Sequence, residues 1–302
     1  MKGTLSPDPE RLRTNSLFHV LGTAEFYAFV EANERGASYP AIPDSVVKEF
    51  RIPVPPLEIQ REIVRVLDAF VDLEAELEAE LEERRSQYVY YRDSLLTFRE
   101  AEGVRRIPMG EFAVLVRGNG MPKTDFAESG IGAIHYGQIY THFGTWADHT
   151  KSFVAQSTAT KLAKVDPGDI VITNTSENIE DVGKAVAWLG DIQVVTGGHA
   201  TVIKHDQNPK YLAYYFQTAE FSVAKRRHAS GTKVIDVSAK SLAKIEIPLP
   251  SREEQDRIVA VLDKFDALVN DLSVGLPAEL AARRKQYEHY RDRLLTFEEL
   301  PS

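Results

Sequence analysis

Two short stretches of the chain combine positive charge with small, flexible residues. Lys225-Arg226-Arg227-His228 is a dense cationic cluster, and Ser230-Gly231-Thr232-Lys233 follows it directly. The cations, hydroxyl groups and backbone amides of such a segment suit phosphate oxygens. Asn119-Gly120-Met121-Pro122-Lys123 is a second basic loop. These residue types predict contacts with a nucleic-acid backbone, and the alternative for each stretch is an ordinary solvated turn.

Other polar residues could read base edges. His135-Tyr136-Gly137-Gln138-Ile139-Tyr140 places amide and phenol groups near an expected strand end, and Gly197-Gly198-His199 allows close approach of the backbone. A glutamine can read adenine in the major groove through two hydrogen bonds. Asn174-Thr175-Ser176-Glu177-Asn178 is a further polar loop that could contact DNA. The candidate DNA-binding residues are Lys123, Tyr136, Gln138, Ser176, His199, Arg226, Arg227, Ser230, Thr232 and Lys233.

The chain shows no motif that supports catalysis. It has no Walker loop, Rossmann glycine fingerprint, nucleophile elbow or His-Glu-x-x-His motif. The Asn174–Asn178 run is similar to the short polar motifs of adenine methyltransferases, but it lacks the aromatic residue and the proline that hold a flipped base. His135, His142 and His149 recur every seven residues, but their surroundings predict strand and loop, so we expect no metal site. We therefore expect a non-catalytic protein.

The amino-acid composition limits the classes of protein to which the chain can belong. There are no cysteines, which excludes a disulfide framework and cysteine metal sites. The start of the chain has no apolar signal region, and no apolar run reaches membrane-spanning length, so we expect a soluble, cytoplasmic protein with no membrane partner. The net charge of −9 is unevenly spread: residues 58–83 carry ten acids and two arginines, whereas 105–246 carry 16 basic and 14 acidic residues. The middle of the chain is thus mildly basic.

Residues 104–246 have the pattern of one complete globular domain. Short strands are predicted at 112–117, 131–140, 169–173, 184–189 and 194–204, with glycine, asparagine and aspartate turns between them. Asn208-Pro209 predicts a helix that runs to about His228. These elements predict an α+β fold with a small, mixed, mostly antiparallel sheet.

One stretch of the chain occurs twice. Residues 52–70 and 247–265 share 11 of 19 residues, and 84–98 and 283–297 share 11 of 15. Each copy opens with Ile-Pro-x-Pro and closes with Arg-Arg-x-Gln-Tyr-x-x-Tyr-Arg-Asp-x-Leu-Leu-Thr-Phe. Such identity indicates an internal duplication.

Each copy predicts a long helix with a narrow apolar stripe. No glycine or proline interrupts 57–98, and apolar residues recur at a period of roughly 3.5, so we expect one helix of about 40 residues. The second copy contains Gly275 and Pro277, which predict a break. Because a narrow stripe cannot be buried alone, we expect the two copies to pack as an antiparallel coiled coil, and a bundle or homo-oligomeric coiled coil is the alternative.

The duplicated unit extends upstream of the helices. Ala24-Glu25-Phe26 matches Ala219-Glu220-Phe221, and Gly36 matches Gly231, at the same offset of 195 residues as the helix openings. Residues 16–33 predict a short amphipathic helix. We therefore divide the chain into 1–51, the C-terminal remnant of a first globular domain; 52–103, the first long helix; 104–246, the complete domain; and 247–302, the second long helix.

This layout, the Ile-Pro-x-Pro-x-x-Glu-x-Gln-x-x-Ile-Val-x-x-Leu-Asp openings and the Gly-Thr element before the second of them resemble the specificity (S) subunits of Type I restriction-modification systems. The resemblance covers about 15–298. It implies that the complete domain is a target-recognition domain that reads one half of a split sequence in double-stranded DNA. It also implies that the long helices form a spacer and dock methyltransferase (M) subunits. S-adenosylmethionine, ATP and Mg would belong to the partner subunits, which methylate adenine and, in a restriction (R) subunit, cut DNA.

The chain departs from the family pattern in having one complete recognition domain. We expect it to be an N-terminally truncated S subunit that forms a homodimer, or pairs with another half-length S chain, through its helices. A symmetric pair would read an interrupted palindrome. Two alternatives remain: a shortened fragment that stores a recognition domain for recombination, and a helical scaffold with no DNA role.

Overall fold

The computed structural model describes residues 11–36, 40–99, 101, 103–271 and 273–297. The chain divides into two compact units. The terminal unit comprises Met1–Arg85 and Asp266–Ser302, and the central unit comprises Ser86–Phe265. Residues 1–10, 37–39 and 298–302, which belong to the first and last predicted domains, lie outside the described residues. In the described part of the chain, no helix is both long and apolar enough to cross a membrane.

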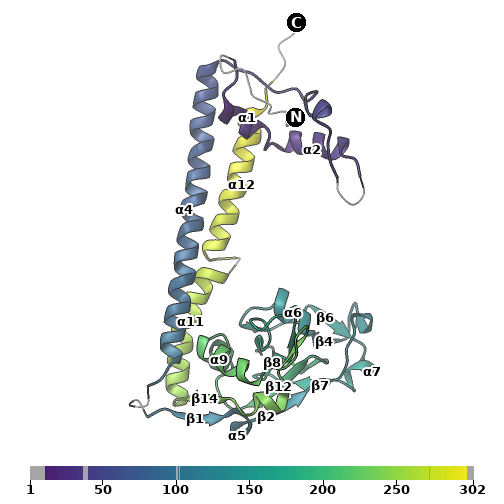
Figure 1. The fold of residues 1–302 in the computed structure, drawn as a ribbon, viewed down its shortest axis with the longest axis vertical. Coiled ribbons are helices and arrows are strands. Elements are labelled where there is room, and N and C mark those ends of the chain that lie inside the picture. The colour runs from purple at the N-terminus through teal and green to yellow at the C-terminus, as the bar shows by residue number, and fades with distance from the viewer. Residues whose placement is uncertain (1–10, 37–39, 100, 102, 272, 298–302) are drawn as a thin grey trace. The chain divides into compact units, whose positions relative to one another are not determined.

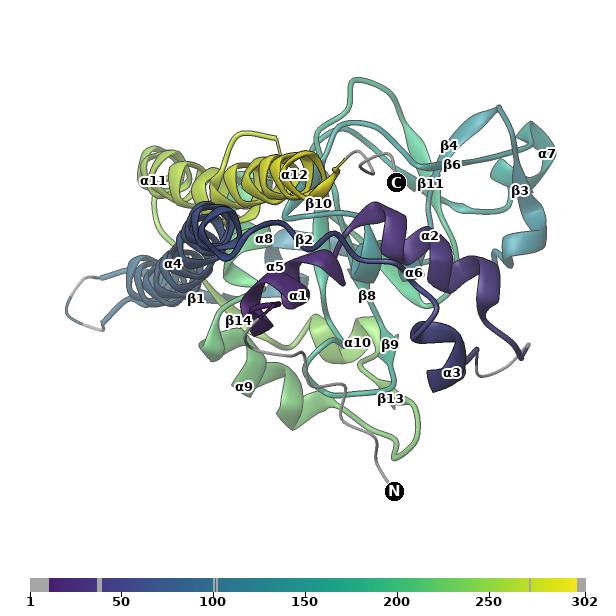
Figure 2. The same cartoon turned by 90° about the horizontal axis from the view of Figure 1, so that it is seen from above.

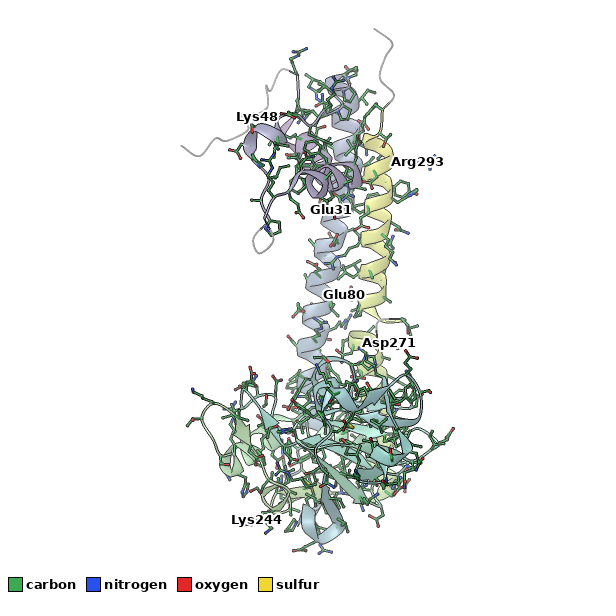
Figure 3. All side chains as sticks on the ribbon, turned by 90° about the vertical axis from the view of Figure 1, so that its right-hand side faces the viewer. Glu31, Lys48, Glu80, Lys244, Asp271 and Arg293 are labelled. Carbon is green, nitrogen blue, oxygen red and sulfur yellow. The ribbon has the colours of Figure 1, made fainter. Side chains whose placement is uncertain are left out.

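The first copy of the duplicated stretch is a single helix, α4 (Leu57–Leu96), as predicted. The second copy is broken into α11 (Arg252–Asn270) and α12 (Leu276–Leu295), again as predicted. A Cβ atom at Gly275 would lie 2.4 Å from the carbonyl oxygen of Ala267, so only glycine fits at the break. Figure 3 labels Asp271 at this break and Glu80 in the acidic stretch of α4.

In the terminal unit, the first part of α4 packs antiparallel to α12 (Figure 1). Phe70 stacks on Tyr290 with ring centroids 5.5 Å apart, and the Arg284 guanidinium donates to Glu74 at 2.6 Å. Leu67, Ile63 and Leu295 are buried in the apolar core between them. The predicted antiparallel coiled coil is thereby confirmed.

Among the described residues of the terminal unit, three short helices precede α4. They are α1 (Thr14–Val20), α2 (Ala24–Asn33) and α3 (Asp44–Val47). The prediction of one helix over 16–33 is wrong, because the Thr23 side chain accepts a hydrogen bond from the Phe26 amide and starts α2 as a separate helix.

The central unit contains two five-stranded sheets with mixed, mostly antiparallel pairing, which confirms the α+β class. The first has the order β2-β12-β8-β10-β5, with bounds Ala113–Arg117, Ala200–His205, Ile170–Thr173, Ala185–Trp188 and Trp146–Ala147. The second has the order β3-β6-β4-β11-β7, with bounds Phe126–Ala127, Ser152–Val154, Ile131–Ile134, Val194–Thr196 and Ala163–Val165. The pairs β10–β5 and β11–β4 are parallel.

Shorter elements complete the central unit. Two-stranded sheets join β1 (Arg105–Pro108) to β14 (Glu246–Leu249), and β9 (Thr175–Ser176) to β13 (Ile235–Asp236). The remaining helices are α5 (Met109–Phe112), η2 (Lys123–Asp125), α6 (Tyr136–Thr141), α7 (Gln156–Ala159), α8 (Pro209–Tyr215), α9 (Ala219–His228) and α10 (Ala239–Leu242). Figure 2 shows these elements from above.

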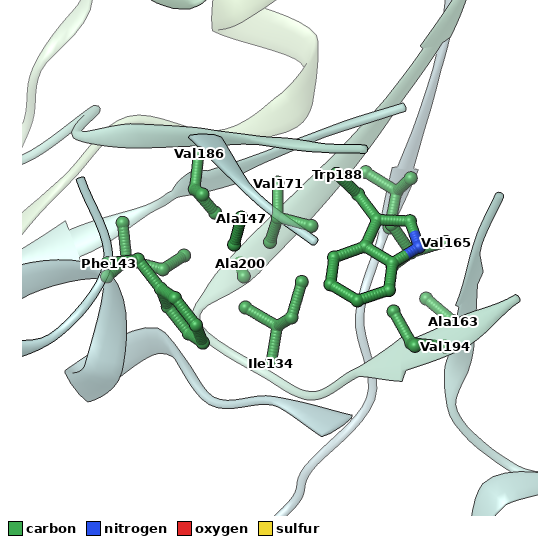
Figure 4. Close-up of a cluster of buried hydrophobic side chains, with 12 residues drawn as sticks. Ile134, Phe143, Ala147, Ala163, Val165, Val171, Val186, Trp188, Val194 and Ala200 are labelled. Atoms are coloured by element: carbon green, nitrogen blue, oxygen red, sulfur yellow. The ribbon is translucent and has the colours of Figure 1, made fainter. Parts of the chain in front are cut away.

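A buried apolar cluster holds the sheets of the central unit together. Trp188 is its largest member and packs with Val165, Val194 and Ile134 (Figure 4). Every residue of β8 and of β10 is buried, which accounts for their almost continuous apolar runs.

Three predicted elements of the central unit are shorter than expected, each for a local reason. The strand at 131–140 ends at Ile134, because His135 caps α6. The strand at 194–204 is two strands, β11 and β12, separated by Gly197-Gly198-His199. The helix at 209–228 is divided into α8 and α9, because Thr218 caps the second one.

Candidate nucleic-acid interface

An aromatic platform forms where β4 ends and α6 begins. The Tyr136 ring centroid lies 4.5 Å from that of His135 and 5.0 Å from that of His199. Tyr140, one turn further along α6, lies 6.5 Å from Tyr136 and donates its hydroxyl proton to the carbonyl of Thr175. Phenol and imidazole rings held together in this way offer both stacking surfaces and hydrogen-bonding atoms.

His199 is held in an unusual backbone conformation. It has φ of 66° and is the one non-glycine residue with positive φ among those the structure describes. Its Nδ1 lies 2.9 Å from Thr175 Oγ1, which fixes the ring against Tyr136. Left-handed backbone at a non-glycine residue is costly and is concentrated at functional sites.

Two glycine-containing loops support His199. A Cβ atom at Gly118 would lie 1.9 Å from the carbonyl oxygen of Gly197, and one at Gly197 would lie 2.3 Å from Met121 Cβ. Asn119 and Gly197 form an isolated bridge between the loops. The expected close backbone approach at 197–199 is therefore made to residues 118–121 of the same chain.

Lys123 brings positive charge to the platform. Burial lowers the pKa of His135, and the positive charge of Lys123 and the nearby His199 lower it further. His135 is therefore held neutral near pH 7, and its Nδ1 accepts a hydrogen bond from the Gly137 amide at 3.1 Å. The side chain of Lys123 itself is exposed.

Gln138 lies beside the platform but is engaged in holding α6. Its Nε2 donates to Ser152 Oγ at 2.6 Å, and its Oε1 accepts from the His135 amide at 3.3 Å. Both ends of the amide group therefore have partners within the domain. The predicted contact of Gln138 with a base would require these two hydrogen bonds to be replaced by hydrogen bonds to the base.

A tight hairpin extends the surface from the platform. Ser230 and Asp236 exchange backbone hydrogen bonds of 2.9 and 2.8 Å, and Gly231, with φ of 99°, makes the turn. A Cβ atom at Gly231 would lie 2.0 Å from the Val234 carbonyl oxygen, which is why glycine is needed there. Thr232 and Lys233 are exposed at its tip.

Strand pairing joins the hairpin to the platform. Ser176 of β9 pairs with Ile235 of β13, and Thr175 pairs with Asp236. Because Thr175 also contacts His199, β9 links the platform to the base of the hairpin. The structure thus places Tyr136 against His199, with Lys123 at the His135 side, and it joins Ser176 to the strand that follows the hairpin of Ser230, Thr232 and Lys233.

The cationic cluster on α9 is divided between two roles. Lys225 is buried, and its ammonium group donates to the carbonyls of Glu180 and Val182 at 2.7 and 2.6 Å. Burial lowers the pKa of Lys225 to about 8. It fastens the loop after β9 to α9 and is not presented to a ligand, contrary to its assignment to the phosphate-binding cluster.

The two arginines of α9 remain at the surface. Arg226 forms an ion pair with Glu180 at 2.9 Å in which both side chains are more than half exposed. Arg227 lines a groove together with Arg106 and Glu220. Arg226 can therefore bind a phosphate by exchanging an exposed partner, which has little energetic cost.

Two supporting residues were not among the predicted site residues. Asn174 is fully buried; its Nδ2 donates to the Val237 carbonyl at 2.7 Å, and its Oδ1 accepts from Thr201 Oγ1 at 2.8 Å. Thr175 fixes His199. Their position in a polar run directly after an apolar strand was the available signal, since strand ends carry site residues.

His142 ends α6 and His149 lies beside Asp148, and the described residues contain no group of three side chains suited to a metal.

Comparisons with known proteins define the class to which this fold and surface belong. The family model of the Type I restriction modification DNA specificity domain matches residues 3–83 and 110–282. The chain belongs to this family.

Relatives extend the match along the chain. It is 31% identical to a type I restriction enzyme specificity subunit of Haemophilus influenzae, covering 95% of this chain and 73% of that protein. It is 34% identical to the EcoR124I/EcoR124II specificity subunit of Escherichia coli, covering 83% of this chain and 63% of that protein. A type I specificity subunit of Mycoplasma pneumoniae is 26% identical and is covered over 97% of its length.

Solved structures share the fold. A chain from a study of assembly and conformational transition of the type I R-M system matches with a TM-score of 0.66 and 23% identity, covering 95% of this chain and 72% of that one. The HsdS subunit of Thermoanaerobacter tengcongensis matches with a TM-score of 0.55 and 22% identity, covering 95% of this chain and 71% of that one.

Proposed function

We propose that the chain is the DNA-reading subunit of a Type I restriction-modification complex and that residues 104–246 read one half-site. The observation that carries the proposal is that β9 links the platform of Tyr136 and His199 to the base of a hairpin whose exposed tip carries Thr232 and Lys233. Rings with donors and acceptors can meet base edges, while the flanking cations and hydroxyl groups meet phosphates. The family membership supports this assignment.

The chain contributes recognition, and its partners contribute the chemistry. We assign adenine methylation with S-adenosylmethionine to methyltransferase subunits docked on the long helices. DNA cleavage with ATP and Mg belongs to a restriction subunit where one is present. The complex acts in the cytoplasm, where its DNA lies. Pairing of two such chains, or of this chain with another half-length S chain, would supply the second half-site and give a split target.

Salt dependence of DNA binding tests the proposal. The chain, with its methyltransferase subunit, is titrated into labelled double-stranded DNA between about 50 and 300 mM KCl, a range over which phosphate contacts weaken steeply. The logarithm of the association constant should fall linearly with the logarithm of the salt concentration. A helical scaffold without a DNA role would show no binding at any salt concentration.

Single lysine substitutions locate the contact. Lys233→Ala should weaken binding to all sequences alike and reduce the salt slope by about 1, as expected for one lost phosphate contact. Lys240→Ala, an exposed lysine on α10 outside the proposed surface, is the matched control and should leave the slope unchanged. Equal slopes for both variants and the wild type would remove the hairpin from the interface.

A further inference from the structure

One side-chain hydrogen bond joins two polar residues at neighbouring strand ends of the central unit. Thr175 begins β9, and His199 directly precedes β12. Thr175 Oγ1 and His199 Nδ1 lie 2.9 Å apart. Among the described residues, neither side chain makes another hydrogen bond. This contact therefore governs where the protons of the hydroxyl group and of the imidazole lie.

The backbone of both residues is held independently of this contact. The Asn174 amide donates to the His199 carbonyl at 2.7 Å. The Tyr140 hydroxyl group donates to the Thr175 carbonyl at 2.8 Å, and Thr175 also pairs with Asp236 of β13. The strand ends therefore place the hydroxyl group opposite the imidazole, and a change of the Thr175 side chain leaves these backbone contacts in place.

The bond to Thr175 favours one of the two neutral tautomers of His199. A neutral imidazole carries one proton, and the hydrogen bond made by one ring nitrogen fixes the state of the other. If Nδ1 carried the proton and donated it, the hydroxyl proton of the half-buried Thr175 would have no acceptor among the described residues. If the hydroxyl group donates to Nδ1 instead, both groups are satisfied and the imidazole proton lies on Nε2.

The second ring nitrogen, Nε2, is available to a ligand. His199 is exposed, and its Nε2 has no hydrogen-bond partner among the described residues. Tyr136 lies against the ring, with centroids 5.0 Å apart and planes 47° apart, so packing as well as the hydrogen bond sets the orientation of the imidazole. The exposed edge of the ring therefore offers a hydrogen-bond donor of defined direction.

The other platform side chains are less suited to telling one base from another. Gln138 has partners at both ends of its amide, and the Tyr140 hydroxyl group donates within the domain. His135 is buried. Tyr136 has a phenol hydroxyl, which can donate or accept and so meets either kind of base atom. Among these side chains, His199 is the one whose exposed nitrogen has a fixed donor character.

We propose that Thr175 determines which base His199 reads, by holding the imidazole as an Nε2–H donor. The inference rests on the proposed function, in which this surface meets base edges. In the major groove guanine presents two acceptors, and adenine N7 and thymine O4 present one each, whereas cytosine presents only its N4 donor. A donor on Nε2 therefore fits guanine best and rejects cytosine. His199 is the reading residue, and Thr175 is a positioning residue.

The first measurement is the protonation state of His199 without DNA. The full chain, with isotope-labelled histidine nitrogens, is studied by NMR at about pH 8, where an ordinary imidazole is neutral. His199→Asn identifies the signals of His199. The wild type should show an unprotonated Nδ1 and a protonated Nε2. Thr175→Val, which removes the hydroxyl group, should give a mixture of the two tautomers, and Thr175→Ser should restore the wild-type state.

The second measurement is base preference, read by selection from a randomised double-stranded library with the chain and its methyltransferase subunit. Loss of enrichment in His199→Asn locates the base pair that His199 contacts. There the wild type should favour guanine over cytosine by about 10-fold, the scale of one good base contact. Thr175→Val should reduce this ratio to about 2-fold or less at that position, because the donor is no longer fixed. Thr175→Ser should restore the ratio.

A matched control removes a threonine hydroxyl group elsewhere. Thr160 is exposed at the end of α7, and its hydroxyl group donates to the Ser157 carbonyl. Thr160→Val should leave both the His199 tautomer and the base ratio unchanged. Thermal unfolding checks that each variant remains folded. The wild-type tautomer and base ratio need no change at Thr175, so they remain decisive if Thr175→Val fails to fold.

Several results would overturn the inference. One is cytosine at the position located by His199→Asn, and another is a proton on Nδ1 in the wild type. A third is Thr175→Val with the wild-type tautomer and the wild-type base ratio. In these cases an enriched sequence with the wild type still supports the proposed function. A wild type that enriches no sequence would contradict the proposed function itself, and base reading by His199 with it.

Discussion

The two copies of the helix-opening motif form the same anchor in different surroundings. In the terminal unit, Gln60 Oε1 accepts the Arg13 amide at 3.0 Å and its Nε2 donates to the Pro55 carbonyl at 2.7 Å. In the central unit, Gln255 makes the same bonds, to the Asn208 amide and the Pro250 carbonyl, both at 3.0 Å. The repeated glutamine fastens the preceding segment to the first turn of each long helix.

The next anchor keeps its carboxylate and changes its partners. Asp68 contacts His19 Nε2 at 2.8 Å and Asn15 Nδ2 at 3.4 Å. Asp263 instead accepts from the Tyr214 hydroxyl at 2.7 Å and from the Lys210 ammonium at 2.8 Å. The motif therefore specifies one acceptor on the long helix. The segments packed against it, α1 in the terminal unit and α8 in the central unit, carry different donors to that acceptor.

The two units differ most in how the outer face of the segment packed on the long helix, α8 or α1, is covered. Ala213 on α8 is fully buried in the central unit, whose β10 packs against that helix. Phe18, its counterpart on α1, is 67% exposed within the described residues of the terminal unit. Identical anchors thus hold a recognition domain in one unit and an uncovered helix in the other.

The largest expected effect comes from the glutamine anchors. Gln60→Ala and Gln255→Ala should each destabilise their own unit by about 3 kcal/mol, because each leaves buried backbone groups without partners. Hydrogen exchange followed by mass spectrometry would report the opening of each helix start separately. Gln286→Ala, an exposed glutamine on α12, should cost less than about 0.5 kcal/mol. An effect confined to one of the two anchors would contradict their equivalence.

The next effect depends on pH and belongs to the central unit alone, because the counterpart of Lys225 is Val30. Burial lowers the pKa of Lys225 to about 8, below its ordinary value of 10.5. Above pH 8 the unfolded chain therefore binds more protons, so stability relative to Lys225→Met should rise with pH by up to about 1.4 kcal/mol per unit and level off near the unfolded value. Denaturant unfolding of both proteins between pH 7 and 10 checks this, and a gap that stays flat or narrows would contradict the buried role of Lys225.

The smallest effect compares the two carboxylate anchors. Asp263→Asn should cost about 1.5 kcal/mol and Asp68→Asn about 1 kcal/mol, since both side chains are partly exposed and only Asp263 faces a lysine. Thermal unfolding of the two variants measures both losses of stability, and hydrogen exchange shows which helix start opens in each variant. A larger cost at Asp68 would show that the His19 contact matters more than the ion pair.

The long helices were predictable because their signal is local and repeated. Residues 57–98 have a sustained apolar period without glycine or proline, and Gly275 with Pro277 marks the break in the second copy. The strands β2, β8 and β10 also followed from apolar runs, whereas β3, β5, β6 and β7 lie outside the predicted strands. Short capping interactions did not, because whether His135 or Thr218 starts a helix depends on a hydrogen bond that spacing alone does not reveal.

The candidate site was predicted in outline only. Residue type indicated Tyr136, His199 and the hairpin, but strand pairing between β9 and β13 is what joins them. Lys225 looked like a phosphate ligand in sequence, whereas the carbonyls of Glu180 and Val182 occupy it in the fold. Gln138 was chosen for its amide, which α6 uses as a cap. A contact between distant segments decides each of these outcomes.

The most direct test of the central claim, that this surface reads DNA sequence, is selection from a randomised double-stranded library by the chain with its methyltransferase subunit. The wild type should enrich a defined set of base pairs. His199→Asn, which tolerates the left-handed backbone but removes the imidazole, should lose that enrichment at one or two base pairs and keep its salt-dependent binding. No enriched sequence with the wild type, or the same sequence with both proteins, would contradict the account.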